Sequence, residues 1–238
     1  TEHLELRQAF LLTNSAWLSI ALFGSLPFYF SEINMSFVDS IFESTSGITT
    51  TGATVILNLE NTSYGILIWR ALLQWLGGVG IIVMALAILP MLSIGGMQLF
   101  KTESYETPEK VVPKAASFAA GISIVYLTLT IIWACMLWGA GMPIFDSIAH
   151  AMTTISTGGY STKSLSLAAF NSYSIEIIIT FGMIVGSLPF VHYLSITKNG
   201  WKNLINDDQV KLFFTLVIFV IFIISLYLYL HDVPYLKA

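Results

Sequence analysis

The sequence predicts an all-α integral membrane protein built from tandem units of span, short helix and span. Three features predict this class: 55% of the 238 residues are hydrophobic, only 10% are charged, and the mean hydropathy is +0.78. Soluble domains carry roughly 25% charged residues, so this chain has too few to cover a surface that faces water. An ordinary cytosolic enzyme is therefore excluded.

Five apolar stretches are long enough to be membrane spans, since a helix needs about 20 residues to cross roughly 30 Å of hydrocarbon. The first lacks the basic start and the small-residue cleavage site of a signal peptide, so it is expected to be a true span. The predicted spans cover residues 10–30, 66–92, 117–139, 173–196 and 211–230.

Two half-apolar segments between the spans, 37–48 and 144–155, are too short to cross the bilayer and are expected to re-enter it or lie on its surface. If both re-enter from one side, seven basic residues fall on the opposite side and three on theirs. The positive-inside rule then places the linkers in the cytoplasm and the short segments outside. The seven are Arg7, Lys101, Lys110, Lys114, Lys198, Lys202 and Lys211; the three are Arg70, Lys163 and Lys237.

An internal repeat relates the two short segments at one fixed offset, which matches Asp39 with Asp146. FVDSI at 37–41 aligns without gaps with IFDSI at 144–148, and the alignment continues through TTTG at 49–52 and STGG at 156–159. Each unit contains two full spans, so successive units have the same orientation around an axis along the membrane normal. Such an arrangement is typical of a pore.

The repeat predicts three segments. Residues 1–100 form the first span–pore helix–span repeat, residues 101–200 the second, and residues 201–238 the first helix of a third. Four repeats would close a ring, and the sequence holds about two and a quarter. It starts with Thr and ends soon after an apolar run, so we expect part of a longer protein.

The loops that follow the short segments, TTTGAT at 49–54 and STGGYST at 156–162, are candidates for the chemistry. Irregular backbone at membrane depth must line water or be buried in protein. Carbonyl and hydroxyl oxygens in such a loop can replace the hydration shell of a cation, and neutral oxygens suit a monovalent one. The alternative is that these loops are simple turns; the second copy at a fixed offset favours an ion filter.

Asp39 and Asp146 start the short segments, where they can cap a helix or form an acidic vestibule. Arg70 can pair with Glu43 or Asp39, or act as an interfacial anchor. The GGVG run at 77–80 lacks the context of a phosphate loop, and close helix packing is the better interpretation.

No catalytic residue, cofactor site or resident metal is predicted. The single cysteine, Cys135, cannot form an internal disulfide, and the four histidines are scattered. A net charge of −4 does not favour nucleic acid as a partner.

Three motifs in order resemble the Trk/Ktr-type potassium uptake family, and most of all its TrkH membrane subunit. FESTSGITTTGATV at 42–55 and FDSIAHAMTTISTGGYST at 145–162 are similar to its first and second filter segments. LLQWLGGVGIIVMALAILPMLSIGGMQLFKTES at 72–104 is similar to the helix after the first filter. The chain resembles the first half of such a protein; the third and fourth filters and the family's gating loop are absent.

The resemblance implies four repeats around one potassium pathway, a homodimer in the bacterial inner membrane, and a cytoplasmic TrkA-type ring that binds nucleotide and NAD. It also implies a potassium filter that includes Thr50, Thr51, Gly52, Thr157, Gly158 and Gly159.

The expected function is potassium uptake through a filter of backbone carbonyls, gated by the cytoplasmic nucleotide-binding subunit. Two alternatives remain open from the sequence: a non-conducting membrane scaffold or half-subunit, and a potassium symporter coupled to H⁺ or Na⁺. No chain of buried acidic or histidine residues that would relay protons is visible in the spans, which weakens coupling to H⁺.

Overall fold

The computed structural model describes residues 6–92, 111–190, 192–194 and 202–231. The described residues form helices and irregular segments, without strands. The chain divides into two compact units, Thr1–Ser187 and Leu188–Ala238. The three-part division by repeats remains a prediction.

The first unit contains both short helices and the loops that follow them. Its helices are α1 (Leu6–Gly24), α2 (Leu26–Tyr29), α3 (Phe37–Ile48), η1 (Leu59–Asn61), α4 (Tyr64–Leu92), α6 (Val111–Gly139), α7 (Ile144–Ile155), η3 (Ser166–Phe170) and α8 (Tyr173–Ser187). The second unit contains α10 (Lys202–Asn206) and α11 (Asp208–Leu230).

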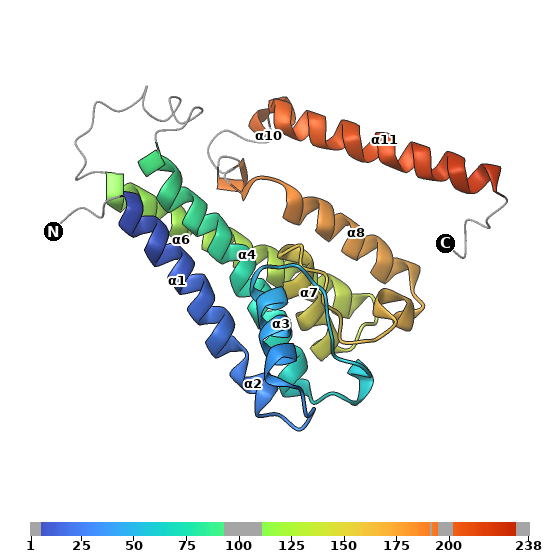
Figure 1. Ribbon diagram of the computed structural model, residues 1–238. Coiled ribbons are helices and arrows are strands. Elements are labelled where there is room, and N and C mark those ends of the chain that lie inside the picture. Colours follow the sequence, from blue (N-terminus) through green and yellow to red (C-terminus); the bar gives the residue numbers. More distant parts are fainter. Residues whose placement is uncertain (1–5, 93–110, 191, 195–201, 232–238) are drawn as a thin grey trace. The chain divides into compact units, whose positions relative to one another are not determined.

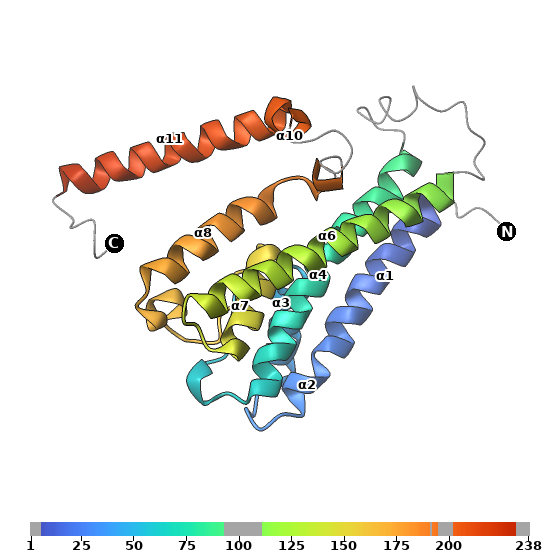
Figure 2. The same cartoon turned by 180° about the vertical axis from the view of Figure 1, so that it is seen from behind.

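The short helices pack between the long ones of the first unit. In Figures 1 and 2, α3 lies against α1 and α4, and α7 lies against α4, α6 and α8. The α4 helix thus contacts both short helices, one from each predicted repeat. It is the element on which the two loops are assembled.

Both predicted short helices are present with the predicted bounds. The α3 helix begins at an N-cap, Ser36, whose hydroxyl oxygen accepts a hydrogen bond from the Asp39 N–H at 3.1 Å. It ends where Thr50 takes a left-handed backbone conformation, which a right-handed helix cannot continue. The α7 helix ends in the same way before Thr157.

The fourth predicted span is wrong as a single continuous helix. It was expected over 173–196, but α8 ends at Ser187. Pro189 explains the break, because proline has no N–H to donate and disfavours helical backbone in the residue before it. Residues 191, 195 and 196 of the predicted span lie outside the described residues.

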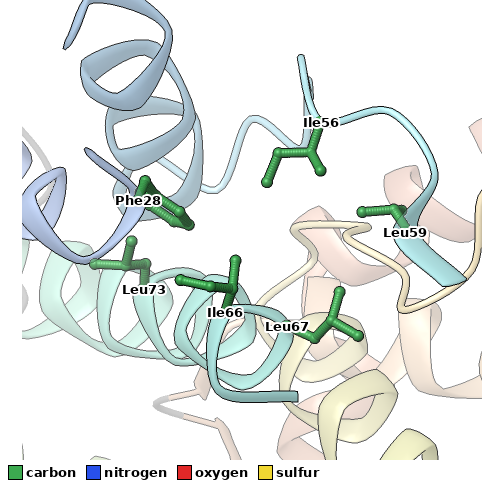
Figure 3. Packing of buried hydrophobic residues seen from close by; sticks show 6 residues of the cluster. All are labelled: Phe28, Ile56, Leu59, Ile66, Leu67 and Leu73. Atoms are coloured by element: carbon green, nitrogen blue, oxygen red, sulfur yellow. The ribbon is translucent and has the colours of Figure 1, made fainter. Parts of the chain in front are cut away.

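Apolar side chains from three segments form a core beside α4. Ile66, Leu67 and Leu73 of α4 belong to one buried cluster with Phe28 of α2. Figure 3 shows Ile56 and Leu59, from the segment after the first loop, lying over the same face of α4. This packing fixes the chain that leaves the first loop.

Four helices among the described residues are long and apolar enough to cross a membrane: Phe10–Tyr29, Tyr64–Ile82, Ala119–Gly139 and Asp208–Leu230. Tyr173–Ser187 is apolar but shorter. On α11, apolar side chains are exposed along most of the helix, as expected for a surface that faces lipid or another helix.

Candidate functional site

The two Thr/Gly loops have the same backbone conformation at matched positions. Thr50 and Thr157 have φ of 55° and 54°, and Gly52 and Gly159 both have φ of 80°. The hydrogen bonds match as well: the N–H of Thr51 donates to the Ser46 carbonyl and that of Gly158 to the Thr153 carbonyl, both at 2.9 Å. The sequence repeat is therefore also a repeat of local structure.

Both threonine positions carry a side chain in a region that glycine usually occupies. The same departure from normal backbone at matched positions of the two repeats points to a shared requirement of the loops.

The first loop is held by a buried carboxylate on its own short helix. Glu43 is fully buried, and its oxygens accept hydrogen bonds from the Thr54 hydroxyl at 2.9 and 3.1 Å and from the Val55 N–H at 3.0 Å. The Ser46 hydroxyl donates to the Ala53 carbonyl at 2.6 Å. These bonds fix the part of the loop that follows Gly52.

The second loop is held by an imidazole. His150 Nδ1 lies 2.8 Å from the Asp146 carbonyl, which can only accept, so Nδ1 carries a proton. In neutral imidazole Nε2 is then an acceptor, and it takes the Ser161 hydroxyl proton at 3.0 Å. The Ser161 hydroxyl oxygen in turn accepts from the Lys163 N–H at 3.0 Å.

Arg70, on α4, links the two loops. Its Nε–H donates to Glu43 Oε1 at 2.7 Å and its Nη1–H to the Ser161 carbonyl at 3.0 Å. The guanidinium carbon lies 4.0 Å from the centre of the Tyr160 ring, within range of a cation–π interaction. A single cation thus contacts both repeats.

Tyr160 makes a second link between the loops. Its hydroxyl lies 3.0 Å from the Glu43 carbonyl and 3.2 Å from the Ala53 carbonyl, and its proton is shared between them.

The backbone on each side of Gly159 is bound by Gln74 of α4: Nε2–H donates to the Gly158 carbonyl at 2.9 Å, and Oε1 accepts from the Tyr160 N–H at 3.1 Å.

The six predicted filter residues lie together in these two loops but differ in exposure. Thr51, Thr157 and Gly159 are exposed, Thr50 and Gly52 are half-buried, and Gly158 is buried. A Cβ placed on Gly52 would meet the Gly158 carbonyl oxygen, so the two loops touch at that point. Their role in binding potassium remains a prediction.

The aspartates that start the short helices do not cap them. Ser36 caps α3, and the Asp39 carboxylate accepts the Ser36 hydroxyl proton at 2.7 Å. The α7 helix has Pro143 at its N-cap, and the Asp146 carboxylate instead accepts the Thr162 hydroxyl proton at 2.6 Å. In both repeats the aspartate carboxylate accepts a hydrogen bond from a hydroxyl group instead of from a free backbone N–H of the helix. The capping interpretation is therefore wrong.

Two other interpretations of the sequence are confirmed. Arg70 pairs with Glu43 and is 1% exposed, so it is not an interfacial anchor. The GGVG run at 77–80 is a packing element, because a Cβ on Gly77 would meet the Ile48 carbonyl oxygen at the end of α3.

Gln74, Tyr160 and His150 were not singled out as loop supports. The available signal was the placement of Arg70 and Gln74 four residues apart in an apolar run, which puts two polar side chains on one helix face. The described residues hold no group of three or more His, Cys, Asp or Glu that would bind a metal ion.

Comparison with known proteins identifies the family to which the chain belongs. The family model for TrkH, described as "Cation transport protein", matches residues 1–237. The chain belongs to the TrkH family. This finding confirms the resemblance seen in the three motifs, and the family is described as one of cation transport proteins.

Several TrkH-family relatives are similar over nearly the whole chain. The Trk system potassium uptake proteins TrkH of Salmonella typhimurium and of Escherichia coli K12 are each 38% identical over 97% of the chain and 48% of their own length. TrkI of Halomonas elongata is 37% identical over 92% of the chain and 45% of its own length. The chain spans about half the length of the curated relatives it matches.

A solved TrkH-family structure has the same fold. The crystal structure of the potassium transporter TrkH from Vibrio parahaemolyticus matches with a TM-score of 0.88 at 36% identity, over 99% of this chain and 48% of that one. Together with the apolar helices, these relatives establish a multi-pass protein of the inner membrane.

Proposed function

We propose that this chain supplies two of the segments that line a potassium uptake pathway, with loops 49–54 and 156–162 as filter segments. The matched left-handed backbone at Thr50 and Thr157 and at Gly52 and Gly159 carries the proposal. Two loops with one geometry are what a pathway around an axis requires, because each repeat must present the same oxygen atoms to the ion. The relatives' printed names specify potassium uptake.

The support behind the loops fits this role. Glu43, Arg70 and Gln74 are all at most 1% exposed, so the charged groups lie behind the loops and not on them. The oxygens left to meet an ion are neutral carbonyls and hydroxyls. Neutral oxygens suit a monovalent cation, whereas a calcium site more often uses carboxylates.

Glycine substitutions in the intact protein test the filter. Gly52→Ser and Gly159→Ser are each expected to lower potassium uptake and the preference for potassium over sodium, in cells without other potassium uptake systems. Gly141→Ser is the matched control for Gly159→Ser, because both glycines have positive φ, 95° and 80°, and no neighbour within 4 Å of the Cβ position, while Gly141 lies outside the two loops. Normal uptake and selectivity in both filter variants, with normal amounts of protein in the membrane, would contradict the proposal.

The family resemblance further supports a homodimer and a cytoplasmic TrkA-type ring that binds nucleotide and NAD and gates the pathway. The predicted cytoplasmic linkers that would meet such a ring, around Lys101–Lys110 and Lys198, lie outside the described residues. Co-purification of the intact protein with the ring subunit, with and without nucleotide, tests the partner. Reversal potentials measured across H⁺ and Na⁺ gradients separate a channel from a coupled symporter.

A further inference from the structure

Gln74 is a fully buried side-chain amide in an apolar helix. A buried amide is costly unless both its donor and its acceptor are bonded. In Gln74 both groups are bonded, and both partners are backbone groups of the second loop. These partners, the Gly158 carbonyl and the Tyr160 N–H, lie 84 and 86 residues further along the chain. The Gln74 amide therefore forms these hydrogen bonds with the second loop and not with the backbone of its own helix.

The two bonded backbone groups flank Gly159. The Gly158 carbonyl accepts from Gln74 Nε2 and the Tyr160 N–H donates to Gln74 Oε1, so the amide spans the left-handed residue between them. This pairing fixes the rotation of the peptide groups on either side of Gly159. The rotation of these groups decides which carbonyl oxygens face the pathway.

The fit between Gln74 and the loop depends on glycine. A Cβ on Gly158 would collide with the Gln74 amide, and a Cβ on Gly52 would meet the Gly158 carbonyl oxygen. The Gly158 oxygen therefore lies between the Gln74 amide and the first loop, while Thr157 and Gly159 on either side are exposed. Gln74 thus bonds the carbonyl of Gly158, the buried residue between the exposed Thr157 and Gly159.

The second repeat has no matching amide. Phe181 occupies the position in the second repeat that matches Gln74, and it is exposed on α8. Arg70, one turn before Gln74 on α4, reaches the same second loop through the Ser161 carbonyl. The second loop is thus supported from the first repeat by two polar side chains on one face of α4.

From this arrangement we infer that Gln74 is a positioning residue that sets ion selectivity, by fixing the orientation of the Gly158 carbonyl and the Tyr160 N–H around Gly159. This inference rests on the proposed filter function. It assigns selectivity in the second loop to a side chain of the first repeat that does not itself touch the ion.

Gln74→Met in the intact protein is the direct test, because methionine has a similar length and flexibility but forms no comparable hydrogen bonds. We expect a rise in the KM for potassium and about a tenfold loss of potassium-over-sodium preference, at a normal amount of protein in the membrane. Gln74→Asn keeps the amide but is one methylene too short, and is expected to show a smaller loss of the same kind. Gln209→Met on the exposed start of α11 is the control, with no change expected.

A purely structural role for Gln74 predicts a different result: less protein in the membrane, with KM and ion preference per molecule unchanged. That result in Gln74→Met, or in Gln74→Asn if the methionine variant does not insert, would overturn the inference. Parallel measurements on Gly52→Ser and Gly159→Ser separate the two proposals. If those variants lose selectivity and the Gln74 variants do not, only the role of Gln74 fails; if the glycine variants are normal, the filter itself fails.

Discussion

Glu43 and His150 occupy the same position in the two repeats, and each binds the loop residue eleven positions further along. Glu43 accepts the Thr54 hydroxyl proton, and His150 Nε2 lies 3.0 Å from the Ser161 hydroxyl. In both repeats the side chain at this position supports the loop, through a carboxylate in the first repeat and an imidazole in the second. In the first repeat Arg70 supplies a cation beside the carboxylate. In the second repeat the position that matches Arg70 is occupied by Ile177, which carries no charge.

The Glu43–Arg70 pair predicts strong coupling between the two residues. Arg70→Met leaves a carboxylate buried without its cation, which is expected to cost roughly 3–5 kcal/mol. Adding Glu43→Gln removes the unpaired charge, so the double variant should be more stable than Arg70→Met alone. Thermal unfolding of the detergent-solubilised protein, analysed as a double-mutant cycle, measures this; additive effects would contradict the coupling.

His150 predicts a difference between two substitutions of similar size. His150→Leu leaves the Ser161 hydroxyl proton without its acceptor and removes the imidazole N–H from the Asp146 carbonyl, with an expected loss of about 1–3 kcal/mol. His150→Gln can still bond to Ser161 and should lose less. Heat resistance of the solubilised protein is the measurement, and His231→Leu at the exposed end of α11 is the control. Equal losses for leucine and glutamine would rule out the hydrogen-bonding role.

The glycines of α4 are expected to differ sharply from one another. Gly77→Ala places a methyl group against the Ile48 carbonyl oxygen, whereas the nearest atom to a Cβ on Gly80 is 3.9 Å away, on the Trp17 ring. Overpacking of this kind costs about 1–3 kcal/mol. Gly77→Ala should therefore lower the unfolding temperature and Gly80→Ala should not, and a similar effect of both would contradict the packing role.

Glu60 predicts a dependence on pH in the segments that follow the two loops. The Ser164 hydroxyl and N–H donate to its carboxylate at 2.6 and 2.8 Å and hold the Glu60 pKa below its ordinary value of 4.5. Because the folded pKa is lowered, the stabilising contribution is complete above the ordinary value and disappears as the pH falls through the lowered one. The protection of amides around Ser164 from hydrogen exchange, corrected for the intrinsic exchange rate at each pH, should therefore fall at acid pH in the native protein.

Glu60→Gln is expected to remove most of this pH dependence, and Glu32→Gln, on an exposed residue before α3, to leave it unchanged. A loss of protection at acid pH that persists in Glu60→Gln would assign the effect to another group.

The sequence predicted local elements well and contacts between repeats poorly. The bounds of α3 and α7 agree with the prediction, because length, amphipathic pattern and flanking Thr/Gly residues are all local. The break in α8 before Pro189 was missed because the apolar run continues past it. The contacts of Gln74 with Gly158 and Tyr160 were missed because they join two repeats, and periodicity within one helix does not report which distant loop a side chain will meet.

The order of synthesis gives the support from α4 a further consequence. Arg70 and Gln74 precede the loop they hold, Gln74 by 84 residues from Gly158, so their helix leaves the ribosome before that loop exists. The second loop can then form against side chains already in place. The reverse order would leave the backbone groups of the second loop without their side-chain partners until α4 was made. It also follows that the two halves of this chain are not interchangeable modules: a duplicated second repeat, placed before the first, would lack the helix face that completes its loop.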